Sequence, residues 1–450
     1  MPEESKEVNV EELLAKANEP KAYAMKYHPF YRGKIETALK APVRSFDDFA
    51  IWYTPGVAEP CLKIKEDPNL SFEYTNRWNT IAIVSDGTRV LGLGNIGPSA
   101  GLPVMEGKAM LFKYLGGVDA FPLCIGTRNA EEIIKFVKLL EPCIGGVNLE
   151  DIESPKCYEV LETLKKELNI PVWHDDQQGT ALVTVAGFVN ALKIVGKKIN
   201  EVSIAMVGAG AANSNIVRYL GVAGADLKKF YVCDSRGILN ASRLDSIKND
   251  PMKVFLTNDT NEEGRSGGIA EAMKGADACI AASRPGPGII KKEWVATMAD
   301  DAIVFACANP IPEIWPWEAK EAGARITATG RSDFVNQVNN SVGFPAVFRG
   351  ALDVSANTIT DEMCIAAAYA IAEYAERKGI SEDYIIPSMS ETEMFIEEAV
   401  AVGMKAMEQG VARRKISQTE LKELAATAIL RAQNSTQLLM KHNFIRPPPS

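Results

Sequence analysis

Short apolar runs alternate with helix-length stretches along most of this chain, and this alternation constrains the fold more than any other feature. The apolar runs span residues 81–84, 118–123, 146–149 and 170–173, and helical patterning fills the segments 106–115, 130–140 and 155–168 between them. Strands that alternate with helices form parallel βαβ units, because two parallel strands need a long crossover connection. We therefore expect an α/β fold.

A second region of the same kind follows a bridging helix predicted at about residues 179–195. Its predicted strands are 202–207, 230–233, 278–281, 303–306 and 325–328, and the chain turns helical and Ala-rich from about Asp361. A chain of 450 residues can hold two or three domains. We expect an N-terminal α/β domain over 1–177, a doubly wound domain over 178–335, and a mostly helical segment over 336–450 that packs back on both. Before residue 40 we expect a helix that Pro20 breaks.

A Gly-rich turn follows the first strand of the second region. The strand runs into Gly208-Ala-Gly210-Ala-Ala-Asn213 and then into a helix. In a Rossmann-type domain the first glycine makes the tight turn, the second lets the pyrophosphate approach the backbone, and the helix N-terminus faces the phosphate charge. We predict NAD or NADP binding by Gly208, Gly210, Ala211, Ala212 and Asn213. A structural turn is the alternative, since Asn213 stands where the fingerprint has Gly or Ala.

The next strand ends in Asp234, which is placed to accept hydrogen bonds from the adenosine ribose of the cofactor. An acid at this position favours the free 2′-hydroxyl of NAD. Arg236 and Arg243 follow closely and could meet the 2′-phosphate of NADP. The sequence leaves both cofactors open.

Two acidic pairs follow two successive predicted strands. Glu150-Asp151 comes after one strand and Asp175-Asp176 after the next, with a helix between them. A right-handed crossover makes these strands parallel, so both pairs lie at the same sheet edge, where α/β proteins place ligands. Oxygen donors without histidine suit Mg²⁺ or Mn²⁺. Any one of these acids alone could instead cap a helix, and we interpret the adjacent His174 as a packed neighbour, not a ligand.

Composition excludes several classes. The net charge of −9 argues against nucleic acid or an anionic membrane surface as a partner, and three histidines are too few for a His-rich zinc site. The sequence has no apolar run that would span a membrane. With eight cysteines, no C-x-x-C pair and no N-terminal targeting pattern, we expect reduced thiols and a cytoplasmic protein.

Several segments together resemble the malic enzyme family in its shorter, bacterial and archaeal form. They are Tyr53-Thr-Pro-Gly-Val57, Asp86-Gly-Thr-Arg-Val-Leu-Gly-Leu-Gly-Asn-Ile-Gly97, Gly107-Lys108, Leu149-Glu-Asp-Ile152, His174-Asp-Asp-Gln-Gln-Gly-Thr-Ala181 and Gln337-Val-Asn-Asn340. They occur in the family's order over about residues 50–350. The resemblance implies oxidative decarboxylation of (S)-malate to pyruvate and CO₂ with reduction of NAD or NADP, by a homo-oligomer for which a dimer is expected.

The resemblance also implies individual roles. Glu150, Asp151 and Asp176 match the metal ligands, Lys108 the general base, Tyr53 the general acid and Asp175 the carboxylate that supports the lysine. Arg89 matches the arginine that pairs with a malate carboxylate, Asn309 and Asn340 match substrate-contacting amides, and Asn309 and Asn339 match cofactor contacts. Without the resemblance, Lys108 and Arg89 would be ordinary surface residues and Tyr53 a packed aromatic.

The implied chemistry is physically reasonable. We expect Lys108, with a pKa lowered by burial or by the charge of the metal, to take the malate hydroxyl proton, and Tyr53 to protonate C3 after CO₂ leaves. Three alternatives remain open at this point. They are a malolactic enzyme that releases lactate, an oxidoreductase for another β-hydroxy acid, and a catalytically silent nucleotide-binding regulator.

Overall fold

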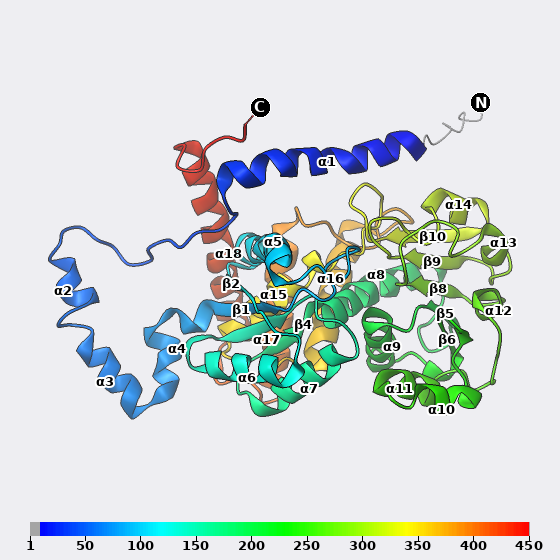
Figure 1. Ribbon diagram of the computed structural model, residues 1–450, viewed down its shortest axis with the longest axis horizontal. Coiled ribbons are helices and arrows are strands. Elements are labelled where there is room, and N and C mark those ends of the chain that lie inside the picture. Colours follow the sequence, from blue (N-terminus) through cyan, green and yellow to red (C-terminus); the bar gives the residue numbers. More distant parts are fainter. Residues whose placement is uncertain (1–9, 450) are drawn as a thin grey trace.

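Two parallel β-sheets, each covered by helices, form the body of the computed structural model, which describes residues 10–449 (Figure 1). The first sheet has the strand order β2-β1-β3-β4 and is parallel throughout. Its strands are β1 (Thr80–Ser85), β2 (Asp119–Cys124), β3 (Gly146–Leu149) and β4 (Val172–His174), and its connecting helices are α5 (Pro98–Gly116), α6 (Ala130–Leu140) and α7 (Lys156–Glu167).

The first sheet is buried on both faces, as a parallel sheet between helices must be. Successive residues of β1 point to opposite faces: Ile81 and Ile83 pack in the cluster that includes Phe112 of α5, whereas Ala82 and Val84 pack in the cluster that includes α6 and α7. Because both faces of this sheet are buried, its strands are largely apolar runs and do not alternate apolar with polar residues. The α/β fold class expected from the sequence is confirmed.

The second sheet has the order β10-β9-β8-β5-β6-β7, and only the short β7 is antiparallel. Its strands are β5 (Ile204–Val207), β6 (Phe230–Asp234), β7 (Gly237–Ile238), β8 (Ala278–Ala281), β9 (Ala302–Ala306) and β10 (Ala324–Thr329). Its helices are α9 (Ala211–Val222), α10 (Leu244–Ile247), α11 (Pro251–Asp259), α12 (Ile269–Met273), α13 (Lys292–Val295) and α14 (Pro316–Glu321). Chain order reverses beside β5, and such a switch point is where doubly wound sheets bind ligands.

Helix α8 (Thr180–Val195) leads from one sheet to the other, and nearly all of its residues are buried. Among the described residues, the segment Asp175–Val195 is the one helix long and apolar enough to cross a membrane, and 72% of its apolar 18-residue window is buried inside the fold. That is the composition of a core helix, so its length is weak evidence for a membrane span.

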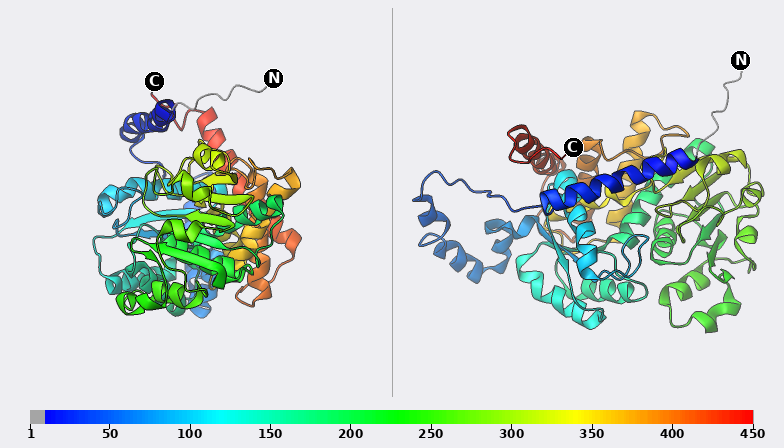
Figure 2. Two further views of the ribbon diagram at one scale, coloured as in Figure 1. Left: turned by 90° about the vertical axis from the view of Figure 1, so that its right-hand side faces the viewer. Right: turned by 45° about the horizontal axis from the view of Figure 1, so that its top comes forward.

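The C-terminal helices pack on both sheets' helices, as Figures 1 and 2 show. They are α15 (Phe344–Asp353), α16 (Asp361–Lys378), α17 (Thr392–Glu408) and α18 (Gln418–Lys441). Helix α16 packs against α8, and α18 packs against α5. Residues 10–449 also form six 3₁₀ turns: η1 (Pro68–Leu70), η2 (Asn76–Asn79), η3 (Glu141–Cys143), η5 (Leu227–Lys229), η6 (Ala241–Arg243) and η7 (Asn340–Val342).

The N-terminal part departs from what we expected. Helix α1 (Val10–Tyr31) does not end at Pro20 but continues through it and through Pro29. A proline removes one backbone hydrogen bond but fits a helix that bends locally, so the expected break was wrong. Beyond α1 lie α2 (Asp48–Trp52), α3 (Ala58–Glu66) and α4 (Ser71–Tyr74), and Figure 1 shows α2 and α3 standing away from the body.

Candidate active site

One cavity of about 1210 Å³ gathers most of the residues singled out in the sequence. From the first sheet and its loops, Arg89, Lys108, Glu150, Asp151 and Asp176 line it. From the second region, Gly208, Gly210, Ala211, Ala212, Asn309, Asn339 and Asn340 line it. The acidic cluster and the Gly-rich turn therefore face the same space, although they belong to different sheets.

The acidic cluster forms where two neighbouring strands end. Leu149 of β3 is in register with His174 of β4, so the residues that follow them emerge at the same edge. Glu150, Asp151 and Asp176 each place a carboxylate oxygen within 4.8 Å of the others. Asp176 lies in η4 (Asp175–Gly179), a π-helical turn, and such turns are frequent at functional sites.

The charges of this cluster are not balanced. Burial, with further contributions from neighbouring acids, raises the pKa of Glu150 well above its usual range although Lys108 opposes the shift. Burial and the nearby Asp176 raise the pKa of Asp151 to about 8. Asp151 also has a buried Oδ2 atom without a hydrogen-bond partner among the described residues. Buried carboxylates that repel one another and retain free oxygens fit a hard divalent cation such as Mg²⁺ or Mn²⁺.

Lys108 is buried on α5 and its ammonium group lies among acids. Its Nζ is 3.0 Å from Glu150 Oε1, pairs more closely with Asp175 Oδ2, and lies 4.1 Å from the centre of the Phe344 ring. Burial alone lowers the pKa of Lys108, but Asp175 and Glu150 outweigh it and raise this pKa above its ordinary value. Burial alone therefore does not produce the lowered pKa that we expected from burial or from the charge of the metal.

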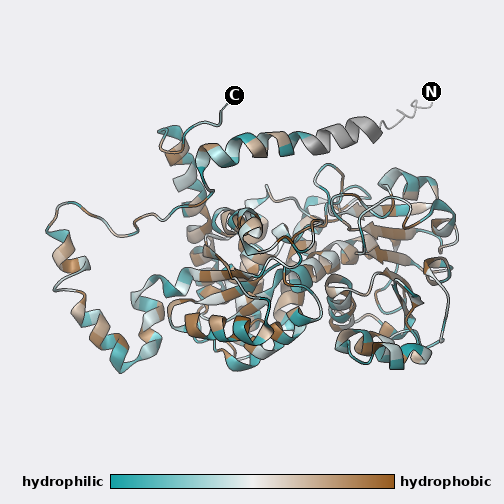
Figure 3. Ribbon diagram, viewed as in Figure 1, coloured by the Kyte–Doolittle hydropathy of each residue, from teal (hydrophilic) through white to brown (hydrophobic). Residues whose placement is uncertain are grey.

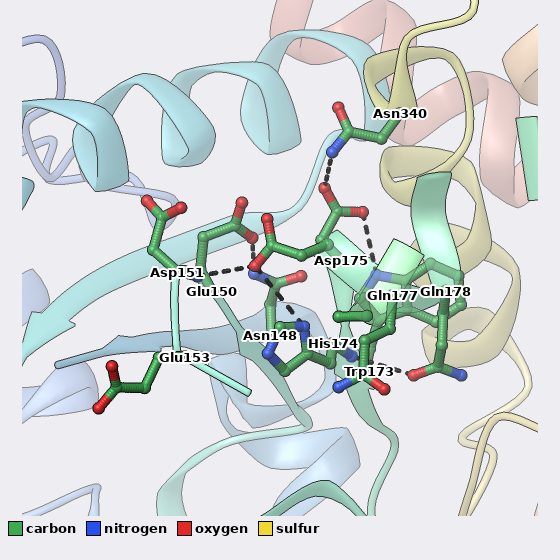
Figure 4. Close-up of polar contacts among 12 residues, drawn as sticks. Asn148, Glu150, Asp151, Glu153, Trp173, His174, Asp175, Gln177, Gln178 and Asn340 are labelled. Carbon is green, nitrogen blue, oxygen red and sulfur yellow. Dashed lines mark hydrogen bonds and ion pairs between the residues drawn. The ribbon is translucent and has the colours of Figure 1, made fainter. Parts of the chain in front are cut away.

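Asp175 is the fully buried centre of the network that holds Lys108. Trp173 Nε1 donates to its Oδ1 at 3.1 Å, and the side-chain amide of Asn340 donates to its Oδ2 (Figure 4). A side chain at Gly179 would collide with it, because a Cβ there would lie 2.0 Å from Asp175 Oδ1. Asp175 does not line the cavity itself; it supports the lysine from below.

The Gly-rich turn has the conformation that glycine permits. Gly208 has a φ of +108°, and a Cβ at this position would lie 2.7 Å from the carbonyl oxygen of Ala282. Asn213, in contrast, is buried beneath the turn and donates from Nδ2 to the carbonyl oxygens of Val207 at 2.8 Å and Gly208 at 2.9 Å. The structure thus places Asn213 as a brace for the turn and outside the residues that line the cavity.

Asp234 lies beside a second cavity of about 680 Å³, on the other side of Gly208. Its carboxylate is held by both terminal nitrogens of Arg243 at 2.8 Å, with Lys253 Nζ at 3.3 Å. The acid expected to receive ribose hydroxyls is therefore paired with cations before any ligand binds.

Arg89 and Tyr53 have different surroundings. The backbone N–H of Arg89 donates to the carbonyl of Asp151 at 3.0 Å, so its loop is attached to the acidic cluster and its exposed side chain lines the cavity. Tyr53 follows α2, is 71% exposed and does not line the cavity. Within a single chain, the predicted site residues thus line one cavity, except Tyr53, Asn213, Asp234 and Asp175. Asp175 contacts the cavity-lining Lys108.

His174 is fully buried, and neither ring nitrogen has a hydrogen-bond partner among the described residues. Burial lowers its pKa, and its Nδ1 is 3.7 Å from Asp176 Oδ2. Two supporting side chains were not predicted from the sequence: Asn148, which donates to Glu150 at 2.8 Å, and Trp173, which donates to Asp175. The sequence does contain a signal for both residues. Each is a hydrogen-bond donor inside a buried strand and lies two positions before an acid of the site.

The comparisons with known proteins agree with this arrangement. The model of the malic enzyme N-terminal domain matches residues 32–133, and that of the malic enzyme NAD-binding domain matches residues 177–409. A bifunctional malic/malolactic enzyme of Bacillus subtilis is 48% identical over 403 residues, which cover 89% of this chain and 96% of that relative.

The chain belongs to the malic enzyme family.

Other members of the malic enzyme family extend the comparison. The NAD-dependent malic enzyme of Geobacillus stearothermophilus is 48% identical over 85% of this chain and 78% of its own length. The malic enzyme structure from Entamoeba histolytica superposes with a TM-score of 0.95 at 46% identity, over 99% of this chain and 93% of that one. Further relatives, 40% identical, are named NADP-dependent malic enzymes. The resemblance that the motifs suggested is confirmed.

Proposed function

We propose that this protein oxidises and decarboxylates malate to pyruvate and CO₂, using NAD or NADP and a divalent cation, Mg²⁺ or Mn²⁺. The observation that carries the proposal is the shared cavity: a buried lysine, a triad of carboxylates and a dinucleotide-type turn all meet there. Hydride transfer needs the nicotinamide beside the substrate, and decarboxylation of a β-keto acid needs a Lewis acid at the same carbon skeleton. One cavity provides room for both.

Glu150, Asp151 and Asp176 would hold the cation, and the Gly208 turn with Asn309 and Asn339 would hold the nicotinamide cofactor. When bound, the cation supplies Lewis-acid polarisation of the substrate oxygens and the nicotinamide accepts the hydride. Neutralisation of the clustered carboxylates by a cation also removes the repulsion that their burial creates. The donor set contains oxygen only, which favours Mg²⁺ or Mn²⁺ over zinc.

The chain's own residues would bind and move protons. Arg89 presents a planar guanidinium to a malate carboxylate, and Asn340 an amide. The charge of a cation held by Glu150 would lower the pKa of Lys108, which would then take the proton of the C2 hydroxyl, and Asp175 would keep the lysine in place. Tyr53 then delivers a proton to C3 of the decarboxylated product, which completes pyruvate.

Tyr53 is exposed and lies outside the cavity of its own chain. Residues 41–66, here termed the arm, expose large apolar side chains, with Phe46 at 89%, Ile51 at 57% and Trp52 at 49%. Figure 3 shows hydrophobic as well as hydrophilic residues along the ribbon of this segment. The arm's side-chain hydrogen bonds are internal, for example Arg44 to Asp48. An apolar surface of this kind is typical of an interface. We therefore propose a homo-oligomer, with a dimer as its smallest form, in which the arm carries Tyr53 to the partner's cavity.

A cytoplasmic location is part of the same proposal. All eight cysteines are free, as expected in a reducing compartment. We propose no nucleic acid or membrane partner, since the net charge of −9 opposes both.

The test is to incubate the protein with (S)-malate, Mn²⁺ and NAD or NADP, and to identify the product. Pyruvate together with reduced cofactor supports the proposal. The malolactic reaction is the second candidate, because the Bacillus subtilis relative is named a bifunctional malic/malolactic enzyme. Lactate without net reduced cofactor would identify that reaction, and no product with either cofactor would exclude both.

A further inference from the structure

Two cavities meet at the loop that follows β8. The larger one contains the acidic cluster, the smaller one contains Asp234, and Gly208, Ser283 and Arg284 line both. A dinucleotide extended across the Gly-rich turn would place its nicotinamide half in the first cavity and its adenosine half in the second. The diphosphate that joins the halves would then pass the residues that the cavities share.

The loop is fixed against the Gly-rich turn at its first residue. The N–H of Ala282 donates to the carbonyl of Val207 at 3.1 Å, which continues the pairing of β8 with β5. The carbonyl of Ala282 lies so close to Gly208 that a Cβ there would be 2.7 Å away. Arg284 follows two residues later, so its position beside the turn is set by the sheet.

Arg284 differs from three other arginines around the second sheet. Arg243 pairs with Asp234, Arg325 with Asp301, and Arg331 with Asp333. Within the part of the chain that the structure describes, the exposed guanidinium of Arg284 has no hydrogen bond or ion pair. An uncompensated cation with five donors lies where two cavities meet, and such a group is suited to a diphosphate.

A buried acid holds this loop from the other side. Glu313 is fully buried, its Oε1 accepts from Ser283 N at 2.8 Å and Ser283 Oγ at 2.9 Å, and its Oε2 accepts from Ala308 N at 3.0 Å. One carboxylate thus joins the loop after β8, which carries Arg284, to the loop after β9, which carries Asn309. Both loops line the larger cavity.

We propose that Arg284 binds the diphosphate of the dinucleotide and that Glu313 is the positioning residue that sets Arg284 beside it. The inference rests on the proposed use of NAD or NADP. Glu313 acts through the backbone and hydroxyl of Ser283 and touches no ligand itself. Neither residue belongs to the Gly-rich turn or the acidic cluster, so the cofactor contacts extend to a second loop of the sheet.

Calorimetric binding of ADP-ribose and of adenosine tests the role of Arg284 without turnover. Arg284→Gln should weaken ADP-ribose binding by about tenfold or more, the loss of a charge-assisted pair, and change adenosine binding less than about twofold. Arg431→Gln, an exposed arginine of α18, is the matched control and should change neither. Unchanged ADP-ribose affinity, equal losses for both ligands, or no ADP-ribose binding by the unmodified protein would overturn the inference.

A double-mutant comparison tests the role of Glu313. The side-chain NH₂ of a glutamine cannot accept from Ser283 or Ala308, so Glu313→Gln should weaken ADP-ribose binding and raise KM for NAD(P) more than it lowers kcat. In protein that already carries Arg284→Gln, the second change should add little; independent, additive losses would overturn the positioning role. Malate turnover is measured separately: unmodified protein that binds ADP-ribose but leaves malate intact contradicts the proposed function and not this inference.

Discussion

The backbone N–H of Asp151 donates to Oδ2 of Asp176 at 2.9 Å and so joins the loop after β3 to the turn after β4. Asp151 adopts a left-handed backbone conformation, with φ of 55°, to make this contact possible. The two loops therefore carry their carboxylates at a fixed spacing before any cation binds. Preorganisation of this kind lowers the cost of ordering the ligands when a cation arrives.

Removal of one acid should abolish cation binding. We expect Mn²⁺ added to EDTA-treated protein to stabilise it by about 2.7 kcal/mol at one hundred times its Kd, and Asp151→Asn to remove most of this gain. Glu153→Gln is the control, because Glu153 lines the cavity but lies outside the cluster of Glu150, Asp151 and Asp176. Thermal unfolding with and without Mn²⁺ measures the effect. An Asp151→Asn protein that still gains full stability from Mn²⁺ would exclude this cation site.

Loss of the buried lysine should affect turnover far more than cofactor binding. Lys108→Ala is expected to reduce kcat by about 10² to 10⁴, the usual contribution of a general base. Lys113→Ala, a half-exposed lysine of the same helix that pairs with Asp119, should leave kcat close to that of the unmodified protein. Steady-state kinetics together with ADP-ribose calorimetry separates the two effects. A kcat within fivefold for Lys108→Ala would show that another group takes the proton.

If the arm carries Tyr53 to the partner's cavity, two variants that are inactive alone should be active when they are combined in one dimer. If Tyr53 serves the partner's cavity, co-expressed Tyr53→Phe and Lys108→Ala chains form mixed dimers in which one of the two sites has both residues intact. With equal expression and random pairing, about one quarter of all sites should be active. If Tyr53 served its own chain's cavity, the mixture would stay as inactive as each variant alone. Activity assays of the tagged, co-purified heterodimer decide between these results.

A buried acid away from the cavity should destabilise the fold at high pH. Glu398 of α17 is fully buried, neither carboxylate oxygen has a partner among the described residues, and burial raises its pKa well above the ordinary value. Since the folded state holds this proton more tightly than the unfolded chain, its contribution to stability is present at low pH and lost as pH rises. Each unit of such a shift corresponds to about 1.4 kcal/mol.

Glu398→Gln should therefore raise the free energy of unfolding at pH 8, with a smaller gain at pH 5. Urea unfolding at both pH values measures the difference. Glu397→Gln is the matched control, because Glu397 precedes Glu398 in the same helix but its carboxylate is partly exposed and pairs with Arg377. An equal gain at both pH values would show that titration of Glu398 is not the cause.

The sequence was sufficient where local pattern and chain order determine the result. The apolar runs at 146–149 and 170–173 and the helix between them imply a parallel pair, and that pair alone places Glu150 and Asp176 at one edge. The Gly-rich turn could be predicted for the same reason, because strand, turn and helix are consecutive.

Prediction was insufficient where a residue's role depends on distant partners. Asn213 became a brace because the carbonyls of Val207 and Gly208 point at its amide, and Asp234 is paired because η6 brings Arg243 back to it. The pKa of Lys108 depends on Asp175, which Asn340 contacts from 165 positions further along the chain. For Tyr53 the proposed role depends on a second copy of the chain, which no pattern within one sequence specifies.

Oxidative decarboxylation of malate can be tested directly by supplying the protein with (S)-malate, Mn²⁺ and either NAD or NADP. The absorbance of the reduced nicotinamide is followed, and pyruvate is measured in parallel. We predict that reduced cofactor and pyruvate form in equal amounts with at least one of the two cofactors, and that EDTA stops both. No reduced cofactor and no pyruvate with either dinucleotide, in protein that still binds Mn²⁺, would contradict the account.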